Sequence, residues 1–250
     1  MSTRYLLAAL GRAEPGEVQG WMETGGILAL QRALAMDPAA LRAALDGIAR
    51  RDGRGLLSLQ AGQPAHLNLT IGPAPDPTRL IVEELPVWLL GAALLLALAC
   101  EQRVVTIHLT KAGRDHRALL DESRAAMQQL GIVGAGGWAG GIRIEWSPDF
   151  LDNGLDAVTA LLLPVILWQH RDPGTTLLAA SGAVGSPGVY EIPFGLPLRT
   201  FLYTWAGGVP PNVTLHLGER RLELSDLSKP LAFEHFGPAL GSGRLTVSVG

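Results

Sequence analysis

LLAASGAVGSPGVYEIPFGLPLRTFLYTWAGG, residues Leu177–Gly208, is the stretch that decides how the second half of this chain is expected to fold. Closely spaced glycines around Pro187 predict a tight turn that joins strands at 177–184 and 189–192. A helix should follow, and the residues that predict it are Pro197 in its first turn and Leu198, Phe201, Leu202 and Trp205 at helical spacing. Gly207–Gly208 ends that helix. A hairpin, a helix and further strands together indicate a small β-grasp module.

The same stretch resembles a known family. It is similar to the soluble-ligand-binding β-grasp (SLBB) segment of the NADH-binding flavoprotein subunit of respiratory complex I, which has relatives in NAD-linked formate dehydrogenases and NAD-reducing hydrogenases. The matching residues are Gly185–Glu191 (GSPGVYE), Pro193, Gly195, Pro197, Leu198 and Ala206–Gly208. Outside this stretch, the likeness extends to Gly25-Gly26, to Asp37-Pro38 and to Gly237–Gly243 (GPALGSG).

Composition narrows the function classes. A chain of 250 residues can form one large or two small domains, and a net charge of −3 gives no nucleic-acid footprint. The single cysteine, Cys100, excludes a disulfide framework and an all-cysteine iron–sulfur site within this chain. The apolar run near the N-terminus is too brief for a secretory signal, so we expect a cytoplasmic protein.

The most apolar segment is Leu85–Cys100, which carries no charge. At roughly sixteen residues it is shorter than the ~20 that a membrane span needs, so we expect a buried core helix and no transmembrane segment. A strand at 104–109 follows at once, which favours an α/β sandwich. Further expected elements are helices at 27–34, 38–48 (capped by Asp37 and closed by residues 50–53), 115–130 and 155–169, and a strand at 142–146.

The predicted fold is therefore an α/β protein of two domains. Residues 1–172 would form an α/β sandwich like that of the flavoprotein subunit, and residues 173–250 the β-grasp domain. The boundary is placed at the turn Asp172-Pro173-Gly174. In the family, a helical domain with a four-iron cluster follows the β-grasp domain; its cysteines are absent here, so no iron–sulfur cluster is expected.

The resemblance implies a loop that cradles the phosphate of FMN at Gly53–Gly62. The residues that match the family's loop are Gly53, Arg54, Gly55 and Gly62, and Asn68 fits the asparagine that opens the next cofactor-contacting segment. Leu56 and Ser58 replace glycines, Ala61 replaces a threonine, and no lysine follows. A phosphate loop needs backbone N–H groups that an anion can approach without a Cβ in the way. We therefore interpret the five matching residues as a vestigial FMN site.

Three further cofactor elements of the family are missing. Thr70 and Ile71 stand where acidic residues should follow Asn68, and the long loop expected after Trp146 is absent. Leu155-Asp156 replaces a pair of asparagines near the flavin. The six histidines lack metal-ligand spacing and are expected on the surface or in loops.

These patterns favour a cofactor-free, non-catalytic structural or assembly subunit of an NAD(H)-linked electron-transfer complex, with other subunits of that complex as partners. One alternative is an FMN-binding NADH:acceptor oxidoreductase subunit with a divergent flavin site. Another is a stand-alone β-grasp module that binds a ligand. With 48% hydrophobic and only 17% charged residues, the chain is expected to need a partner, which exposed tryptophans or rings such as Phe194 and Phe236 would contact.

Overall fold

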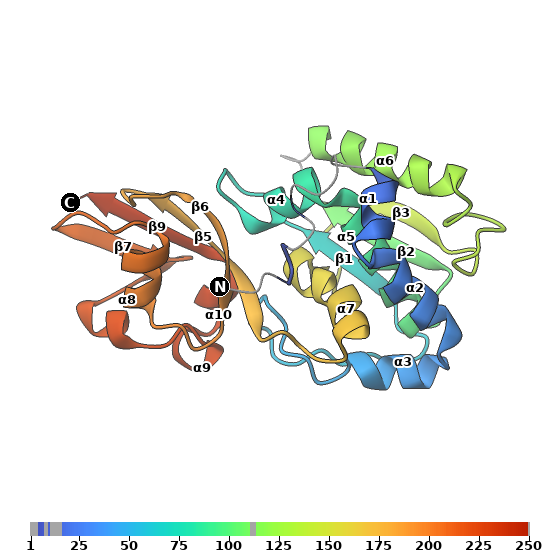
Figure 1. Cartoon of the computed structure of the whole chain (residues 1–250), viewed down its shortest axis with the longest axis horizontal. Helices are drawn as coiled ribbons and strands as arrows, with labels where there is room; N and C mark the ends of the chain where they lie inside the picture. Colours follow the sequence, from blue (N-terminus) through green and yellow to red (C-terminus); the bar gives the residue numbers. More distant parts are fainter. Residues whose placement is uncertain (1–4, 8–9, 11–16, 111–113, 250) are drawn as a thin grey trace.

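The computed structural model describes residues 5–7, 10, 17–110 and 114–249, which form two units side by side along the long axis of the molecule (Figure 1). The helices of the N-terminal unit are α1 (Val18–Glu23), α2 (Gly26–Ala35), α3 (Pro38–Leu45), α4 (Pro77–Glu84), α5 (Pro86–Ala99), α6 (Arg114–Gln129) and α7 (Ala157–Gln169). Its strands are β1 (Ala65–Leu69), β2 (Val104–Leu109), β3 (Arg143–Ser147) and β4 (Leu155–Asp156).

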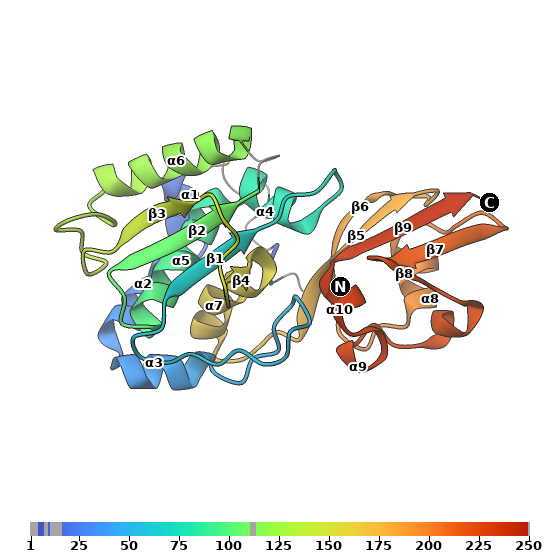
Figure 2. The same ribbon diagram turned by 180° about the vertical axis from the view of Figure 1, so that it is seen from behind.

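The N-terminal unit is built on a parallel sheet of strand order β3-β2-β1-β4. Seen from behind, the strands lie in front of α1, α2 and α5 (Figure 2). Leu67 and Ile107 are buried on the face that meets the helices, whereas His66 and Thr106 on the other face are partly exposed. A parallel sheet usually has helices on both faces, so this one is unusually open among the described residues.

The core of this unit forms because α5 and α7 are apolar all round and therefore pack in the interior. The prediction of a buried helix at Leu85–Cys100 is confirmed, since nearly every residue of α5 is buried. Among the described residues, no single helix is long and apolar enough to cross a membrane. The bent pair α4 and α5, with 100° between its helices, meets that test by length and composition only when taken together.

The C-terminal unit has a five-stranded mixed sheet of order β6-β5-β9-β7-β8. Its elements are β5 (Thr175–Gly182), β6 (Gly188–Pro193), α8 (Leu198–Thr200), a π-helical turn (Phe201–Trp205), β7 (Val213–Leu217), β8 (Arg220–Arg221), a 3-10 turn (Leu224–Ser228), α9 (Phe233–Phe236), α10 (Pro238–Gly241) and β9 (Arg244–Val249). The predicted hairpin is the antiparallel pair β5–β6. The helix stops at Gly207 and Gly208, which both adopt a positive φ. The predicted boundary at residue 172 lies between α7 and β5.

A buried carboxylate ties the chain's first described residues to the C-terminal unit. Glu191 on β6 accepts hydrogen bonds from the backbone N–H groups of Tyr5, Leu6 and Leu7 at 2.9–3.1 Å and from the Thr175 hydroxyl at 2.8 Å. The side chains of Leu6 and Leu7 are buried in the core of the N-terminal unit. Glu191 therefore anchors one segment to both halves of the molecule.

Several predicted details are wrong. The helix predicted at 38–48 ends at Leu45, because residues 47–57 turn back as a hairpin closed by hydrogen bonds between Gly47 and Leu57 and between Leu57 and Ile48. Residues 155 and 156 form β4 and precede α7. The helix predicted from Pro197 begins one residue later, at Leu198.

Of the two rings expected to meet a partner, one is buried and the other is only partly exposed. Phe236 is only 3% exposed, and Phe194 is partly buried with the Arg51 guanidinium 4.8 Å above its ring. His108 also departs from the prediction, since it is buried in β2. These side chains are covered by contacts within the chain.

Candidate functional site

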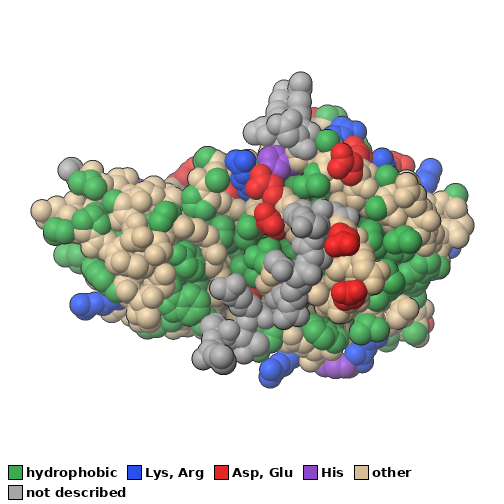
Figure 3. Space-filling model, turned by 45° about the horizontal axis from the view of Figure 1, so that its top comes forward, with side chains coloured by type: hydrophobic (Ala, Val, Ile, Leu, Met, Phe, Trp, Pro, Cys, Tyr) green, Lys and Arg blue, Asp and Glu red, His purple; other side chains and the backbone are tan. Residues whose placement is uncertain are grey.

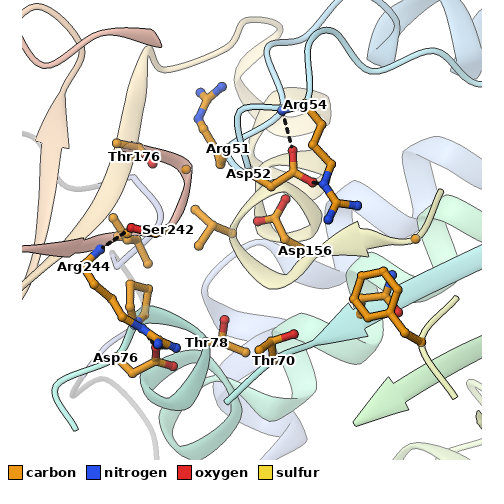
Figure 4. Close-up of a pocket in the computed structure, with 18 residues that line it drawn as sticks. Arg51, Asp52, Arg54, Thr70, Asp76, Thr78, Asp156, Thr176, Ser242 and Arg244 are labelled. Carbon is orange, nitrogen blue, oxygen red and sulfur yellow. Dashed lines mark hydrogen bonds and ion pairs between the residues drawn. The ribbon is translucent and has the colours of Figure 1, made fainter. Parts of the chain in front are cut away.

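A cavity of about 290 Å³ lies between the carboxyl edge of the parallel sheet and the C-terminal unit (Figure 4). Asn68 and Thr70 at the end of β1 line it, together with Asp156 at the end of β4. Ligands of open α/β sheets bind outside the carboxyl ends of the strands, so this is where a site is expected. Figure 4 shows Asp52, Arg54 and Asp156 on one side of the cavity and Asp76 with Arg244 on another.

The hairpin that carries the predicted phosphate loop closes on its own carboxylate. Asp52 accepts hydrogen bonds from Arg50 Nε (3.1 Å) and Nη2 (2.5 Å) and from the backbone N–H of Arg54 (3.0 Å). The Arg54 side chain makes a longer ion pair with Asp52, 3.8 Å between Nε and Oδ2. The negative charge that a phosphate would bring is therefore already supplied by the chain.

Other N–H groups of the same stretch are also occupied. Gly53 N donates to Arg50 O (3.2 Å), Leu57 N to Ile48 O (2.7 Å) and Gly62 N to Cys100 O (2.9 Å). Leu57 is buried, while Leu56 is 66% exposed and points its isobutyl group outward. These three N–H groups are paired within the chain and are not free to bind a phosphate.

Of the five predicted site residues, the structure brings two to the cavity: Arg54 and Asn68. Gly53 (φ +75°) instead packs against the C-terminal unit, where an added Cβ would lie 3.1 Å from Pro238 Cα. Gly55 and Gly62 adopt positive φ values in the hairpin and the turn after it, and an added Cβ at either would meet nothing within 4 Å. The glycines thus serve turns and contact between the units.

Asn68 lines the cavity, but its amide is committed to the fold. Its Nδ2 donates to Leu151 O (2.7 Å), and its Oδ1 accepts from Leu151 N (3.0 Å). The side chain also leaves no room at Gly154, where an added Cβ would lie 2.3 Å from Asn68 Nδ2. Asn68 therefore holds the loop between β3 and β4 in place.

Asp156 is the N-cap of α7, and it accepts a hydrogen bond from Thr159 N at 2.9 Å and one from the Thr159 hydroxyl. Burial raises the pKa of this carboxyl, and the negative charge of Asp52 raises it further, while the hydrogen bonds from Thr159 lower it. Two mutually repelling carboxyl groups therefore face one side of the cavity, which disfavours an anionic ligand there.

On another side of the cavity, an ion pair joins the two units. Arg244 on β9 donates to Asp76 Oδ2 from Nε (2.8 Å) and approaches it with Nη2 (2.6 Å). Asp76 also caps α4 through Arg79 N (2.8 Å) and is 3% exposed. The backbones of the two units also lie close together beside this ion pair. An added Cβ at Gly241 would be only 2.2 Å from Asp52 O.

Sequence reasoning missed most of this cavity. Asp76 could have been found, because an aspartate directly before Pro77 is a helix-start signal. Arg51 gives no such signal: it is buried, pairs with Asp172 at 2.6 Å and donates to Thr175 O at 2.7 Å. His108 lies one strand from Asn68 in the same row of the sheet, with its buried Nδ1 unpartnered among the described residues.

These residues do not fit the phosphate of FMN. Several N–H groups of the loop are already paired, Asp52 binds the nearby Arg50 and Arg54, and Asp156 adds a second carboxyl group. The cavity also stands at the low end of the range of ligand pockets, roughly 300–1,000 Å³.

Comparison of its sequence and fold shows that the chain resembles the NADH-binding flavoprotein subunits of NAD-linked oxidoreductase complexes. In sequence, it is 32% identical over 93 residues to the F subunit of NADH-quinone oxidoreductase of Escherichia coli (strain K12), covering 33% of this chain and 21% of that protein. The same protein of Buchnera aphidicola subsp. Baizongia pistaciae (strain Bp) is 35% identical over 66 residues, covering 24% and 15%. No family model matches.

The fold likeness covers nearly the whole chain. The crystal structure of an NAD+-reducing NiFe hydrogenase in the H2-reduced state superposes with a TM-score of 0.70 over 99% of this chain and 51% of that chain, at 16% sequence identity. The air-oxidized state gives 0.69 over 94% of this chain and 51% of that chain, at 17% identity. The chain thus spans about half the length of these structural relatives, and its sequence match covers about a fifth of the Escherichia coli protein.

Proposed function

We propose that this chain is a non-catalytic structural or assembly subunit of a multi-subunit, NAD(H)-linked electron-transfer oxidoreductase, and that it binds no flavin. The observation that carries the proposal is the hairpin at residues 47–57, which closes on the Asp52 carboxylate where the family resemblance expects a phosphate cradle. A protein that serves as a scaffold needs the fold and the contact between units, and those are the features in which the matching glycines take part here.

The surface supports an assembly role. On the face shown in Figure 3, charged side chains gather over the N-terminal unit, while the C-terminal unit shows mostly apolar and uncharged atoms. Large exposed apolar side chains of the C-terminal unit include Tyr203 (53%), Leu224 (88%) and Val249 (68%). We propose that a partner protein covers these side chains. We further propose that the C-terminal unit is a β-grasp module of the SLBB type.

A second candidate is the FMN-binding subunit with a divergent site. It is favoured by one observation, namely that Arg54 and Asn68 both line a cavity at the carboxyl edge of the sheet. The two candidates differ in what the purified chain binds.

The test is titration of the purified full-length chain with FMN, followed by calorimetry and by quenching of flavin fluorescence. We expect no binding at millimolar FMN and no visible absorbance after gel filtration. One tightly bound flavin per chain would refute the cofactor-free proposal and establish the second candidate.

In parallel, the tagged chain isolated from its native host should carry other oxidoreductase subunits in fixed ratio. A stable monomer without companions would refute the assembly role.

A further inference from the structure

One surface of the N-terminal unit combines exposed apolar side chains from two helices. Trp168, near the end of α7, is 48% exposed, and Leu28 on α2 is 53% exposed. The indole of Trp168 lies over Gly25, where an added Cβ would be 3.4 Å from the ring, and Leu28 is one helical turn further along α2. Figure 1 shows α2 beside α7. We call Leu28, Arg32, Trp168 and Arg171 the α2–α7 patch.

The rim of this patch is positively charged. Arg32 donates to Leu167 O (3.1 Å) and lies against the His170 ring (2.5 Å between Nη1 and Nε2), and Arg171 follows directly. Neither arginine makes an ion pair with a carboxylate of the described residues. Some surface arginines elsewhere do, for example Arg117 with Asp121 at 3.5 Å, whereas the exposed Arg199 and Arg221 make none with a described carboxylate.

The described carboxylate next to the patch in sequence, Glu23, makes no ion pair with either arginine. Glu23, at the end of α1, accepts a hydrogen bond from Gln19 Nε2 at 2.8 Å. The exposed indole and the two arginines thus have no described acidic group of their own chain bound to them. Tryptophan and arginine are the residues most enriched among those that dominate binding energy at protein interfaces.

We propose that the α2–α7 patch docks another subunit of the complex through a surface that combines an apolar depression for Trp168 with carboxylates for Arg32 and Arg171. This inference rests on the proposed assembly function and adds the place and chemistry of the contact. A second copy of this chain fits less well, because a two-fold pairing through the patch would bring two sets of arginines together. An acidic partner gains attraction from the same charges.

The experiment uses the full-length chain and the subunit that co-purifies with it in fixed ratio, identified by mass spectrometry and expressed separately. The dissociation constant is measured by calorimetry for wild type, Trp168→Ala, Arg171→Glu and the matched control Trp138→Ala, which truncates a 39% exposed tryptophan of the glycine loop before β3. Circular dichroism confirms that each variant is folded. A photo-crosslinker at Gln31, also exposed on α2, maps the facing partner peptide.

We expect Trp168→Ala to weaken binding about 30-fold and Arg171→Glu about tenfold, with Trp138→Ala unchanged. The crosslinked peptide should contain Asp or Glu, and a Lys substituted there should restore binding to the Arg171→Glu chain. A complex that forms equally well with all variants, or that crosslinks only through a basic peptide, would overturn this inference while leaving the assembly function in place. Crosslinks between copies of the chain would also overturn it. Absence of any companion subunit would refute both.

Discussion

Replacing Glu191 by Gln tests whether one carboxylate holds the first described residues onto both units. The carboxylate accepts three backbone N–H groups, from Tyr5, Leu6 and Leu7, and the Thr175 hydroxyl. Glutamine keeps one oxygen, and its NH2 group would face N–H donors. With the NH2 group at the Oε2 position only the Leu7 N–H loses its acceptor, because the Tyr5 N–H also donates to Oε1. At ~1–3 kcal/mol for a buried donor left unpaired, this costs about 1–3 kcal/mol.

The alternative is release of the segment. That exposes Leu6 and Leu7, which are 4% and 5% exposed in the fold, at a cost of about 1.5–3 kcal/mol each. Keeping the segment in place is therefore the cheaper route, and we expect the free energy of unfolding to fall by about 1–3 kcal/mol. For a chain of this size, the melting temperature would fall by roughly 2–12 °C.

The assay is urea denaturation of the full-length chain, combined with limited proteolysis of its N-terminal segment. Glu122→Gln on the exposed side of α6 is the matched control and should leave stability within about 0.5 kcal/mol of wild type. If Glu191→Gln were as stable as that control and as resistant to protease as wild type, the anchoring role would be refuted.

Three further outcomes follow from the geometry. Gly241→Ala should destabilise the chain by about 1–3 kcal/mol in calorimetric melts, because its Cβ would lie 2.2 Å from Asp52 O; an unchanged melt would contradict the close contact between the units. Asp156→Asn should gain stability over wild type as pH rises above about 4, because the folded-state pKa of Asp156 is raised and ionisation therefore costs wild-type stability; urea midpoints that keep a constant difference across pH would contradict this. Leu57→Asp should cost more than about 3 kcal/mol, while Leu56→Asp stays within about 0.5 kcal/mol, since the two side chains are 3% and 66% exposed; equal denaturation midpoints would refute the hairpin orientation.

Sequence predicted those parts of the fold that depend on local pattern. Leu85–Cys100 had to be buried because it is apolar on every side, and Asp37 caps α3 through Ala39 N at 2.8 Å, as an aspartate before a proline at a helix start should. The elements that could not be predicted depend on contacts with residues that are far away in the sequence. A two-residue strand such as β4 has no periodicity of its own, and it forms only because β1 lies beside it.

In the candidate site, too, local patterns could be predicted from the sequence, whereas contacts between distant residues could not. The glycines of the expected loop were found by their spacing, but their use in turns and between the units depends on Pro238 and on the hairpin partner strand. Arg244 is separated from Asp76 by 168 residues, so no local sequence pattern predicts that they form an ion pair. Leu56 and Leu57 read alike in sequence, and only the hairpin decides which of them is exposed.

The Glu191 anchor also sets an order of events during synthesis. Tyr5 and its acceptor are 186 residues apart, and ribosomes add about 5–20 residues per second. The first described residues therefore leave the ribosome about 10–40 s before the carboxylate that will hold them. Throughout that time Leu6 and Leu7 lack their anchor, and the core of the N-terminal unit that they complete is open. During that interval the apolar side chains of Leu6 and Leu7 are open to misassociation, and a chaperone that covers them would act then.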